Sequence, residues 1–158
     1  MRTLVFVGCS ILLLLASHAA VLRPAPSFSW LGVGNKAQSS KSLRGQAVVL
    51  LVARSPRDRV LRKQLRNLEE VYQQFASKRV VFAVALKEGE GPIPTDIPMA
   101  VVNDGPGVAS AFGAEDRFQI VIIGRDGNID YQTSKVLSGE RVRDVIQNAF
   151  PVQAEARR

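Results

Sequence analysis

The residues with the clearest chemical potential lie in one short turn that follows an apolar run. Arg54, Arg57 and Arg59 surround a single acid, Asp58, directly after the run 46–53. Guanidinium groups bind carboxylates and phosphates through paired hydrogen bonds. A helix that starts here would add unpaired backbone N–H groups and a partial positive charge. The turn therefore predicts a site for an anion or for a carboxylate-bearing ligand.

The same turn also has a purely structural interpretation. Ser55 is expected at the N-cap of a helix, with Pro56 at its first position and Asp58 two residues later. A cap contributes about 1 kcal/mol, and Asp58 would also offset the neighbouring arginines. Both interpretations remain open, because a bound anion and Asp58 would compete for the same N–H groups.

Two side chains that dominate enzyme chemistry are almost missing. Cys9 is the only cysteine and His18 the only histidine in 158 residues, and both lie in a stretch that we expect to be removed. Thiol–disulfide exchange, nucleophilic catalysis by Cys or Ser–His, and zinc sites built from His or Cys all need these side chains. We therefore expect neither an enzyme nor a cofactor or metal.

The first 19 residues have the pattern of a secretory signal peptide. The basic Arg2 precedes an apolar run that reaches Leu15, and the small residues Ser17 and Ala19 suit cleavage after Ala19. The run is too short for a stable membrane span, and an uncleaved anchor is the alternative. We expect a secreted or periplasmic protein with no transmembrane span after cleavage. The signal does not distinguish a bacterial from a eukaryotic origin.

The chain is basic, and its charge is concentrated. Lys and Arg outnumber Asp and Glu by 21 to 14, with an excess in 54–66 and two arginines at the C-terminus. Such a surface can contact nucleic acid, anionic lipid or acidic polymers, or it can be a solvated helix face. Because export disfavours nucleic acid, we expect an unknown protein or an anionic ligand in the envelope or the extracellular space.

The rest of the chain divides into a linker, one domain and a tail. Residues 20–42 are rich in Pro, Ser, Gly and Ala, a composition that buries too little apolar area to fold alone, although Trp30 could dock. A single domain is expected over 43–150. Pro151 should end its last helix and leave a basic tail over 151–158.

Apolar periodicity predicts the elements of the domain. Continuous β-branched runs at 46–53 and 79–86 are typical of buried strands, and an apolar stripe from Leu61 predicts a helix between them that reaches about Ser77. This order implies a right-handed parallel crossover. The sum is an α/β three-layer sandwich with a mixed sheet of four to five strands. The remaining expected elements are a strand over 98–103, a short helix over 106–112, an antiparallel hairpin of 118–123 with 129–132, and a closing helix from 138 to 150.

This order of elements resembles thioredoxin-like and peroxiredoxin-like proteins. The segments Ile97–Asp104, Val108–Gly113 and Ile122–Ile129 follow the strand, short helix and hairpin of that family, and Leu43–Leu51 and Arg62–Leu65 resemble its first strand and helix. The resemblance covers about 110 residues, from the first of these segments to the closing helix. It implies a thioredoxin-like fold.

The resemblance also implies that the redox residues are lost. Placing the helix of this chain on that of the family puts Asp58 and Leu61 at the two cysteine positions, and counting back from 125–127 puts Phe118 at the cis-proline position. Neither Asp58 nor Leu61 supports redox chemistry. Phe118 is expected to be a core residue or, alternatively, an exposed platform for a peptide. The predicted ligand-binding edge consists of Arg54, Arg57, Asp58, Arg59 and Phe118.

A narrower resemblance concerns the end of the domain. Ile146–Pro151, with Glu155, Arg157 and Arg158, is similar to the closing segment of a cysteine-poor domain of unknown function, found in exported bacterial proteins and in sushi-repeat proteins of the extracellular matrix. That resemblance supplies no catalytic residues. We predict an exported, redox-inactive, thioredoxin-like binding module. The alternatives are a redox accessory or enzyme with a non-thiol mechanism, and a structural component of an envelope or matrix.

Overall fold

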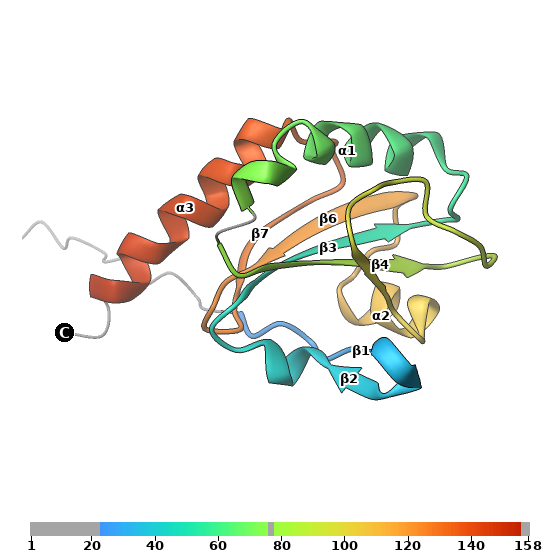
Figure 1. Cartoon of the computed structure of the whole chain (residues 1–158), viewed down its shortest axis with the longest axis horizontal. Coiled ribbons are helices and arrows are strands. Elements are labelled where there is room, and N and C mark those ends of the chain that lie inside the picture. The colour runs from blue at the N-terminus through green and yellow to red at the C-terminus, as the bar shows by residue number, and fades with distance from the viewer. Residues whose placement is uncertain (1–22, 76–77, 156–158) are drawn as a thin grey trace, which may run out of the picture.

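A five-stranded mixed sheet forms the centre of the protein in the order β5-β4-β3-β6-β7 (Figure 1). The computed structural model describes residues 23–75 and 78–155, so the expected signal peptide lies outside it. The three strands on one side of the sheet run parallel, and β6 and β7 are antiparallel to their neighbours. The strands are β3 (Ala47–Ala53), β4 (Val80–Leu86), β5 (Met99–Val101), β6 (Phe118–Ile123) and β7 (Ile129–Thr133).

Helices cover both faces of this sheet. Figure 1 shows α1 (Arg59–Glu69) and α3 (Gly139–Glu155) on one face and α2 (Gly105–Ala111) on the other. The predicted α/β three-layer sandwich with a mixed sheet is therefore confirmed. All seven residues of β3 are buried, as expected for a strand that is covered on both sides.

The segment before the sheet differs from the flexible linker predicted over 20–42. From residue 23 onward it is structured, and β1 (Ser29–Leu31) and β2 (Ala37–Ser39) form an antiparallel hairpin on the same side as α2 (Figure 1). Phe28 and Trp30 are 5% and 6% exposed. The ordering comes from these two rings, which pack into the core, rather than from the composition of the segment.

The first helix begins later and ends earlier than the sequence predicts. Asp58, not Ser55, is the N-cap, and its carboxylate accepts a hydrogen bond from the N–H of Val60 at 2.8 Å. Ser55 belongs instead to a tight turn, in which its carbonyl accepts from the N–H of Asp58. Beyond Glu69 the apolar stripe continues in a short 3₁₀ helix, Tyr72–Phe75, whose two aromatic rings pack edge-on against Phe82 of β4.

The last helix also differs from its prediction. It continues through Pro151 to Glu155, so Pro151 does not end it and the segment 151–155 is not a separate tail. A proline removes one backbone hydrogen bond from a helix, and here the helix extends on both sides of it. Arg157 and Arg158 lie outside the described residues.

A buried glutamine joins the two helices on the first face. The side chain of Gln64 on α1 donates to the carbonyl of Leu137 at 3.0 Å and accepts from its N–H at 2.8 Å, and Asn67 donates to the same carbonyl at 2.8 Å. Both polar groups of Leu137, just before α3, are thereby satisfied. Close packing accompanies these bonds, since a Cβ on Gly139 would lie 2.2 Å from the carbonyl oxygen of Asn67.

Replacing this glutamine should lower the stability of the fold. In the variant Gln64→Leu the buried N–H of Leu137 loses its partner, which costs about 1 to 3 kcal/mol. Urea denaturation of the wild type and the variant measures the difference in the free energy of unfolding. The matched control is Gln73→Leu, an exposed position, which should change the stability by less than about 0.5 kcal/mol. Equal stability of the two variants would contradict this prediction.

Candidate functional site

The candidate site lies where β3 ends and α1 begins. β3 stops at Ala53, which pairs with Phe118, the first residue of β6. Phe118 therefore stands beside the turn 54–58 that leads into the helix. In an α/β sheet this carboxyl edge is where ligands usually bind, so the elements place the predicted residues at one end of the molecule.

Asp58 is at the centre of this edge, and it is buried. Its carboxylate accepts one hydrogen bond from the N–H of Val60 and a second, at 2.7 Å, from Nε of Arg117. The side chain of Asp58 is 1% exposed, whereas that of Arg117 is 61% exposed. The arginine thus lies over the carboxylate and separates it from solvent.

The pKa of Asp58 reflects this environment. Burial raises the pKa of the carboxyl group, but the hydrogen bond from Arg117, the N–H of Val60 and the charge of Arg117 outweigh burial, so the pKa is lower than its ordinary value. Asp58 is therefore ionised at neutral pH. Because its carboxylate already occupies the first N–H groups of the helix, an external anion would have to displace it.

A lysine directly after β4 fixes the loop that precedes Arg117. The ammonium group of Lys87 donates to the carbonyls of Ala114, at 2.9 Å, and of Asp116. These carbonyls belong to the loop that leads directly to Arg117 and β6. The loop is thereby fixed against the carboxyl edge, and this positions the guanidinium group over Asp58.

The other predicted site residues have different surroundings. Arg54 forms an ion pair with Glu88 at 2.9 Å, and this hydrogen bond raises the pKa of Arg54 above its ordinary value. Arg57 and Arg59 are exposed, and Arg59 is the first residue of α1. Phe118 is only 3% exposed and belongs to the core beneath α1 and α3. The core interpretation of Phe118 therefore holds, and Phe118 offers no surface for a ligand.

A cleft of about 500 Å³ opens beside the turn. Its apolar wall is formed by Pro56, Pro92 and Pro94, and two arginines, Arg57 and Arg62, line it together with one acid, Glu90, and with Ser55, Gly89 and Gly91. The loop that follows β4, residues 89–94, thus faces the start of α1 across the cleft. A cleft with proline walls and two guanidinium groups can bind an extended peptide that carries a carboxylate.

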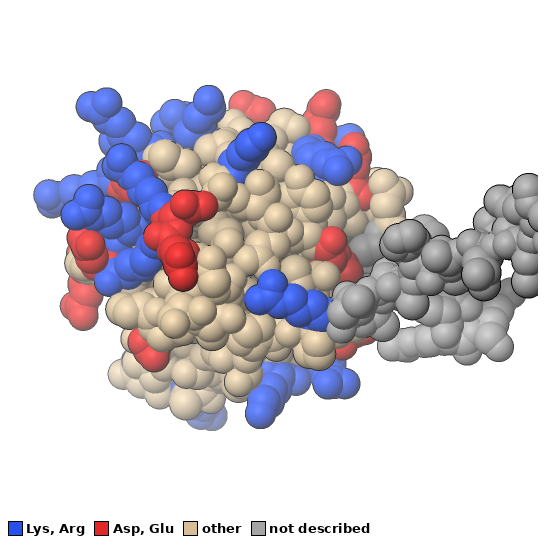
Figure 2. Space-filling model, turned by 180° about the vertical axis from the view of Figure 1, so that it is seen from behind, with Lys and Arg blue, Asp and Glu red and all other residues tan. Residues whose placement is uncertain are grey.

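Basic side chains crowd the end of the protein that carries this cleft. Figure 2 shows Lys and Arg gathered at the end that is remote from the grey segment, with acidic side chains among them. The exposed cations of this region are not matched one for one by ion pairs. Of the ion pairs between described residues, two involve this edge, Arg54–Glu88 and Arg117–Asp58.

Other kinds of site are not supported within residues 23–75 and 78–155. These residues contain no group of three or more His, Cys, Asp or Glu side chains that could hold a metal ion. None of the helices described here is long and apolar enough to cross a membrane.

Comparisons with known proteins give the class of the fold. No protein-family model and no curated protein matches the sequence. Among solved structures, a thiol:disulfide interchange protein of the thioredoxin family from Chlorobium tepidum is similar, with a TM-score of 0.62, at 23% identity over 82% of this chain and 97% of that chain. The thioredoxin domain of a thiol-disulfide oxidoreductase from Bacteroides vulgatus gives 0.64, at 14% identity over 82% and 96%.

A third similar structure is the exposed lipoprotein thioredoxin of Streptococcus pneumoniae, with a TM-score of 0.58 at 13% identity over 78% of this chain and 99% of that chain. These likenesses show that the chain has a thioredoxin-like fold. The thioredoxin-like resemblance inferred from the order of elements is thereby confirmed at the level of the fold. The narrower resemblance to the cysteine-poor domain stays a prediction.

Sequence reasoning missed three parts of this site. Arg117, the partner of Asp58, gave no signal beyond its place directly before the residue aligned with the cis-proline. Arg62 belongs to the basic stretch 54–66, whose composition does not indicate a cleft, and the glycines and prolines of the loop 89–94 indicate only a connection between elements. Contacts between residues about 30 to 60 positions apart, such as 54 with 88 and 58 with 117, depend on tertiary structure and have no local pattern.

The lowered pKa of Asp58 predicts a pH-dependent contribution to stability. Since the pKa in the folded state is below its value of about 4 in the unfolded state, the ionised group stabilises the fold above about pH 4. This contribution is lost as the pH falls through the lowered value. Asp58→Asn should therefore lower the free energy of unfolding at pH 7 by about 1 to 3 kcal/mol, and the difference from wild type should shrink below about pH 4.

Urea denaturation at pH 7 and at pH 3 measures both quantities. Asp96→Asn is the matched control, because Asp96 is exposed and its loss of charge should change stability little at either pH. A difference between wild type and Asp58→Asn that stays the same at both pH values would show that the charge of Asp58 is not responsible.

Proposed function

We propose that the protein is an exported, redox-inactive, thioredoxin-like binding module that binds a carboxylate-bearing segment of a partner protein at the cleft beside α1. The observation that carries the binding proposal is the cleft lined by Arg57 and Arg62 beside three prolines. Redox inactivity is supported by the burial of Asp58 beneath Arg117, at the position that the resemblance assigns to the first cysteine. A redox cysteine has to be reached by its substrate, and here the equivalent side chain is a buried acid.

The absence of a cysteine pair supports the same conclusion. Thiol–disulfide exchange proceeds by attack of a thiolate on a disulfide, and the only thiol of this chain is Cys9, within the expected signal peptide. Export is supported by the pattern of the first 19 residues.

The charges of the cleft favour an acidic partner. Asp58 is neutralised by Arg117, and Arg54 is paired with Glu88, so neither is free for a ligand. Arg57 and Arg62 line the cleft against a single acid, Glu90. Their charges attract a carboxylate, and the proline walls provide an apolar surface for the neighbouring side chains.

A short acidic peptide tests this binding directly. We expect a fluorescein-labelled hexapeptide of alternating Glu and Leu to bind, as measured by fluorescence anisotropy. In the double variant Arg57→Gln/Arg62→Gln it should lose about tenfold or more in affinity, because even one charge-assisted contact contributes about 1.5 kcal/mol or more. The equivalent peptide of Gln and Leu should bind weakly, and added salt should weaken the acidic peptide.

The control variant is Lys63→Gln/Arg66→Gln, which removes the same charge from exposed positions of α1 that do not line the cleft. It should bind the acidic peptide like the wild type. If both double variants weaken binding equally, a diffuse basic face explains the attraction, which favours a structural envelope or matrix component. If the wild type does not bind the peptide, the proposed function is wrong.

Redox inactivity has its own test. The full chain should not accelerate the reduction of insulin by dithiothreitol, because it has no pair of cysteines to exchange with the disulfides of insulin. The rate of insulin precipitation, followed by turbidity, measures this, and Cys9→Ser is the control. Acceleration by the wild type that disappears in Cys9→Ser would establish redox activity and overturn this part of the proposal.

A further inference from the structure

A second cavity lies at the opposite end of the sheet from the candidate site. It has a volume of about 290 Å³ and lies where β3 begins and β6 ends, beside Val48 and Ile123. The chain segment before β1 closes one side, because the N–H of Ala25 donates to the carbonyl of Gly127 at 3.0 Å and the N–H of Ile129 to that of Arg23 at 2.8 Å. These bonds fix the segment across the turn between β6 and β7, so the cavity has a fixed wall.

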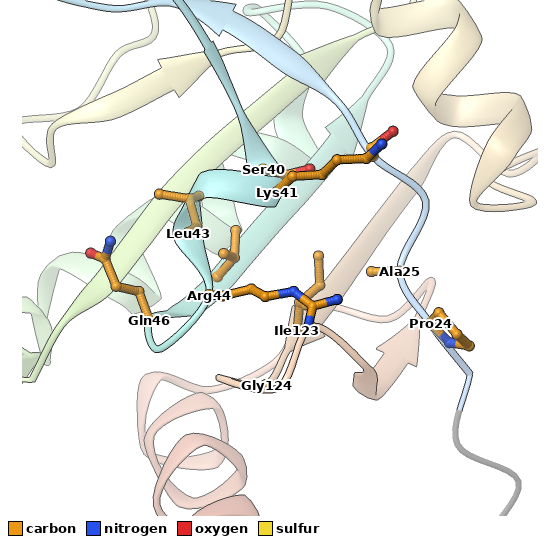
Figure 3. A pocket seen from close by; sticks show the side chains of 12 residues that line it. Pro24, Ala25, Ser40, Lys41, Leu43, Arg44, Gln46, Ile123 and Gly124 are labelled. Atoms are coloured by element: carbon orange, nitrogen blue, oxygen red, sulfur yellow. The ribbon is translucent and has the colours of Figure 1, made fainter.

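The cavity is lined by apolar side chains, by the uncharged polar residues Ser27, Ser40 and Gln46, and by two cations. Val48, Ile123, Leu43 and Ala25 contribute apolar side chains, and Lys41 and Arg44 contribute the charges. Figure 3 shows the side chain of Arg44 extending across the cavity toward Ile123, with Lys41 above it. Both cations are exposed, so they can meet a ligand at the mouth.

No acid of the described chain neutralises this rim. The residues that line the cavity include no Asp or Glu, and Lys41 and Arg44 take part in none of the ion pairs between described residues. The acid next in sequence to the lining residue Gly127 is Asp126, whose oxygens accept from the backbone N–H and the side-chain amide of Asn128 at 3.0 and 2.8 Å. The cavity therefore has unneutralised positive charge above an apolar floor.

We propose that this cavity binds a small amphipathic carboxylate, whose apolar chain fills the space between β3 and β6 and whose carboxylate lies between Lys41 and Arg44. Arginine binds a carboxylate through two parallel hydrogen bonds, and the apolar floor excludes water from the chain of the ligand. A volume of 290 Å³ corresponds to about ten water molecules at roughly 30 Å³ each. A ligand of about ten non-hydrogen atoms therefore fits.

Octanoate has the required size and charge, and it is the probe. Isothermal titration with the purified protein measures its affinity, and octanol, of nearly the same length but uncharged, tests the need for the carboxylate. We expect octanoate to bind at least about tenfold more tightly than octanol. Backbone NMR shifts caused by octanoate should be confined to the residues around the cavity, within 23–27, 40–48 and 123–129.

Two variants test the two halves of the site. Lys41→Gln/Arg44→Gln changes exposed side chains only and should weaken octanoate about tenfold or more without weakening octanol. Ala25→Phe places a ring in the cavity and should weaken both ligands. The matched control Lys63→Gln/Arg66→Gln removes the same charge from α1 and should leave octanoate binding unchanged.

Each possible result either supports the proposed carboxylate site or overturns it. Tight octanoate binding that depends on Lys41 and Arg44, with NMR shifts at the cavity, supports the proposal. The proposal is overturned if octanoate does not bind at millimolar concentration, if octanol binds equally well, or if the control variant weakens octanoate as much as Lys41→Gln/Arg44→Gln. NMR shifts centred on the cleft beside α1 would also overturn it. If Ala25→Phe does not fold, the comparison of the two charge variants still decides.

Discussion

The burial of β3 on both faces is the constraint on which the rest of the fold depends. Its side chains alternate between two cores, with Val49 and Leu51 under α1 and α3 and Leu50 and Val52 on the opposite side. Each face therefore needs a cover. The first face has two long helices, but the second has only α2, which is seven residues long and too short to cover the strands alone.

The N-terminal hairpin completes the second face. Phe28 and Trp30 pack in the same core as Leu50, and the ring of Phe28 lies 6.4 Å from that of Phe112, the residue after α2. A segment rich in Pro, Ser and Gly thus becomes ordered because two aromatic side chains bury a large area against a core that is otherwise open. The backbone of residues 23–25, before these rings, crosses the turn between β6 and β7. The second cavity lies between this segment and the sheet.

An element can be predicted from the sequence when the interactions that form it join residues close together in the chain. Buried strands and the apolar stripe of α1 are local patterns, so β3, β4, β6 and the crossover could be predicted from the sequence. The hairpin at β1 and β2 could not, because its composition is that of a linker and its stability comes from packing against β5 and α2. The sequence predicts the N-cap of α1 at Ser55 rather than at Asp58 for a related reason. The carboxylate of Asp58 also accepts a hydrogen bond from Arg117, which lies 59 residues away, and no local pattern reveals this contact.

The candidate site could be predicted only in part, and the reason lies in how its charges are paired. The sequence located the edge and its arginines, but it could not show which arginines are neutralised. Arg54 and Arg117 form ion pairs with acids of the protein. Arg57 and Arg62 line a cleft whose lining includes one acid. Because a neighbouring acid offsets the field of a paired arginine, the number of basic residues overstates how strongly this edge attracts an anionic ligand. The geometry of the cleft, not the net charge, decides where a partner can be bound.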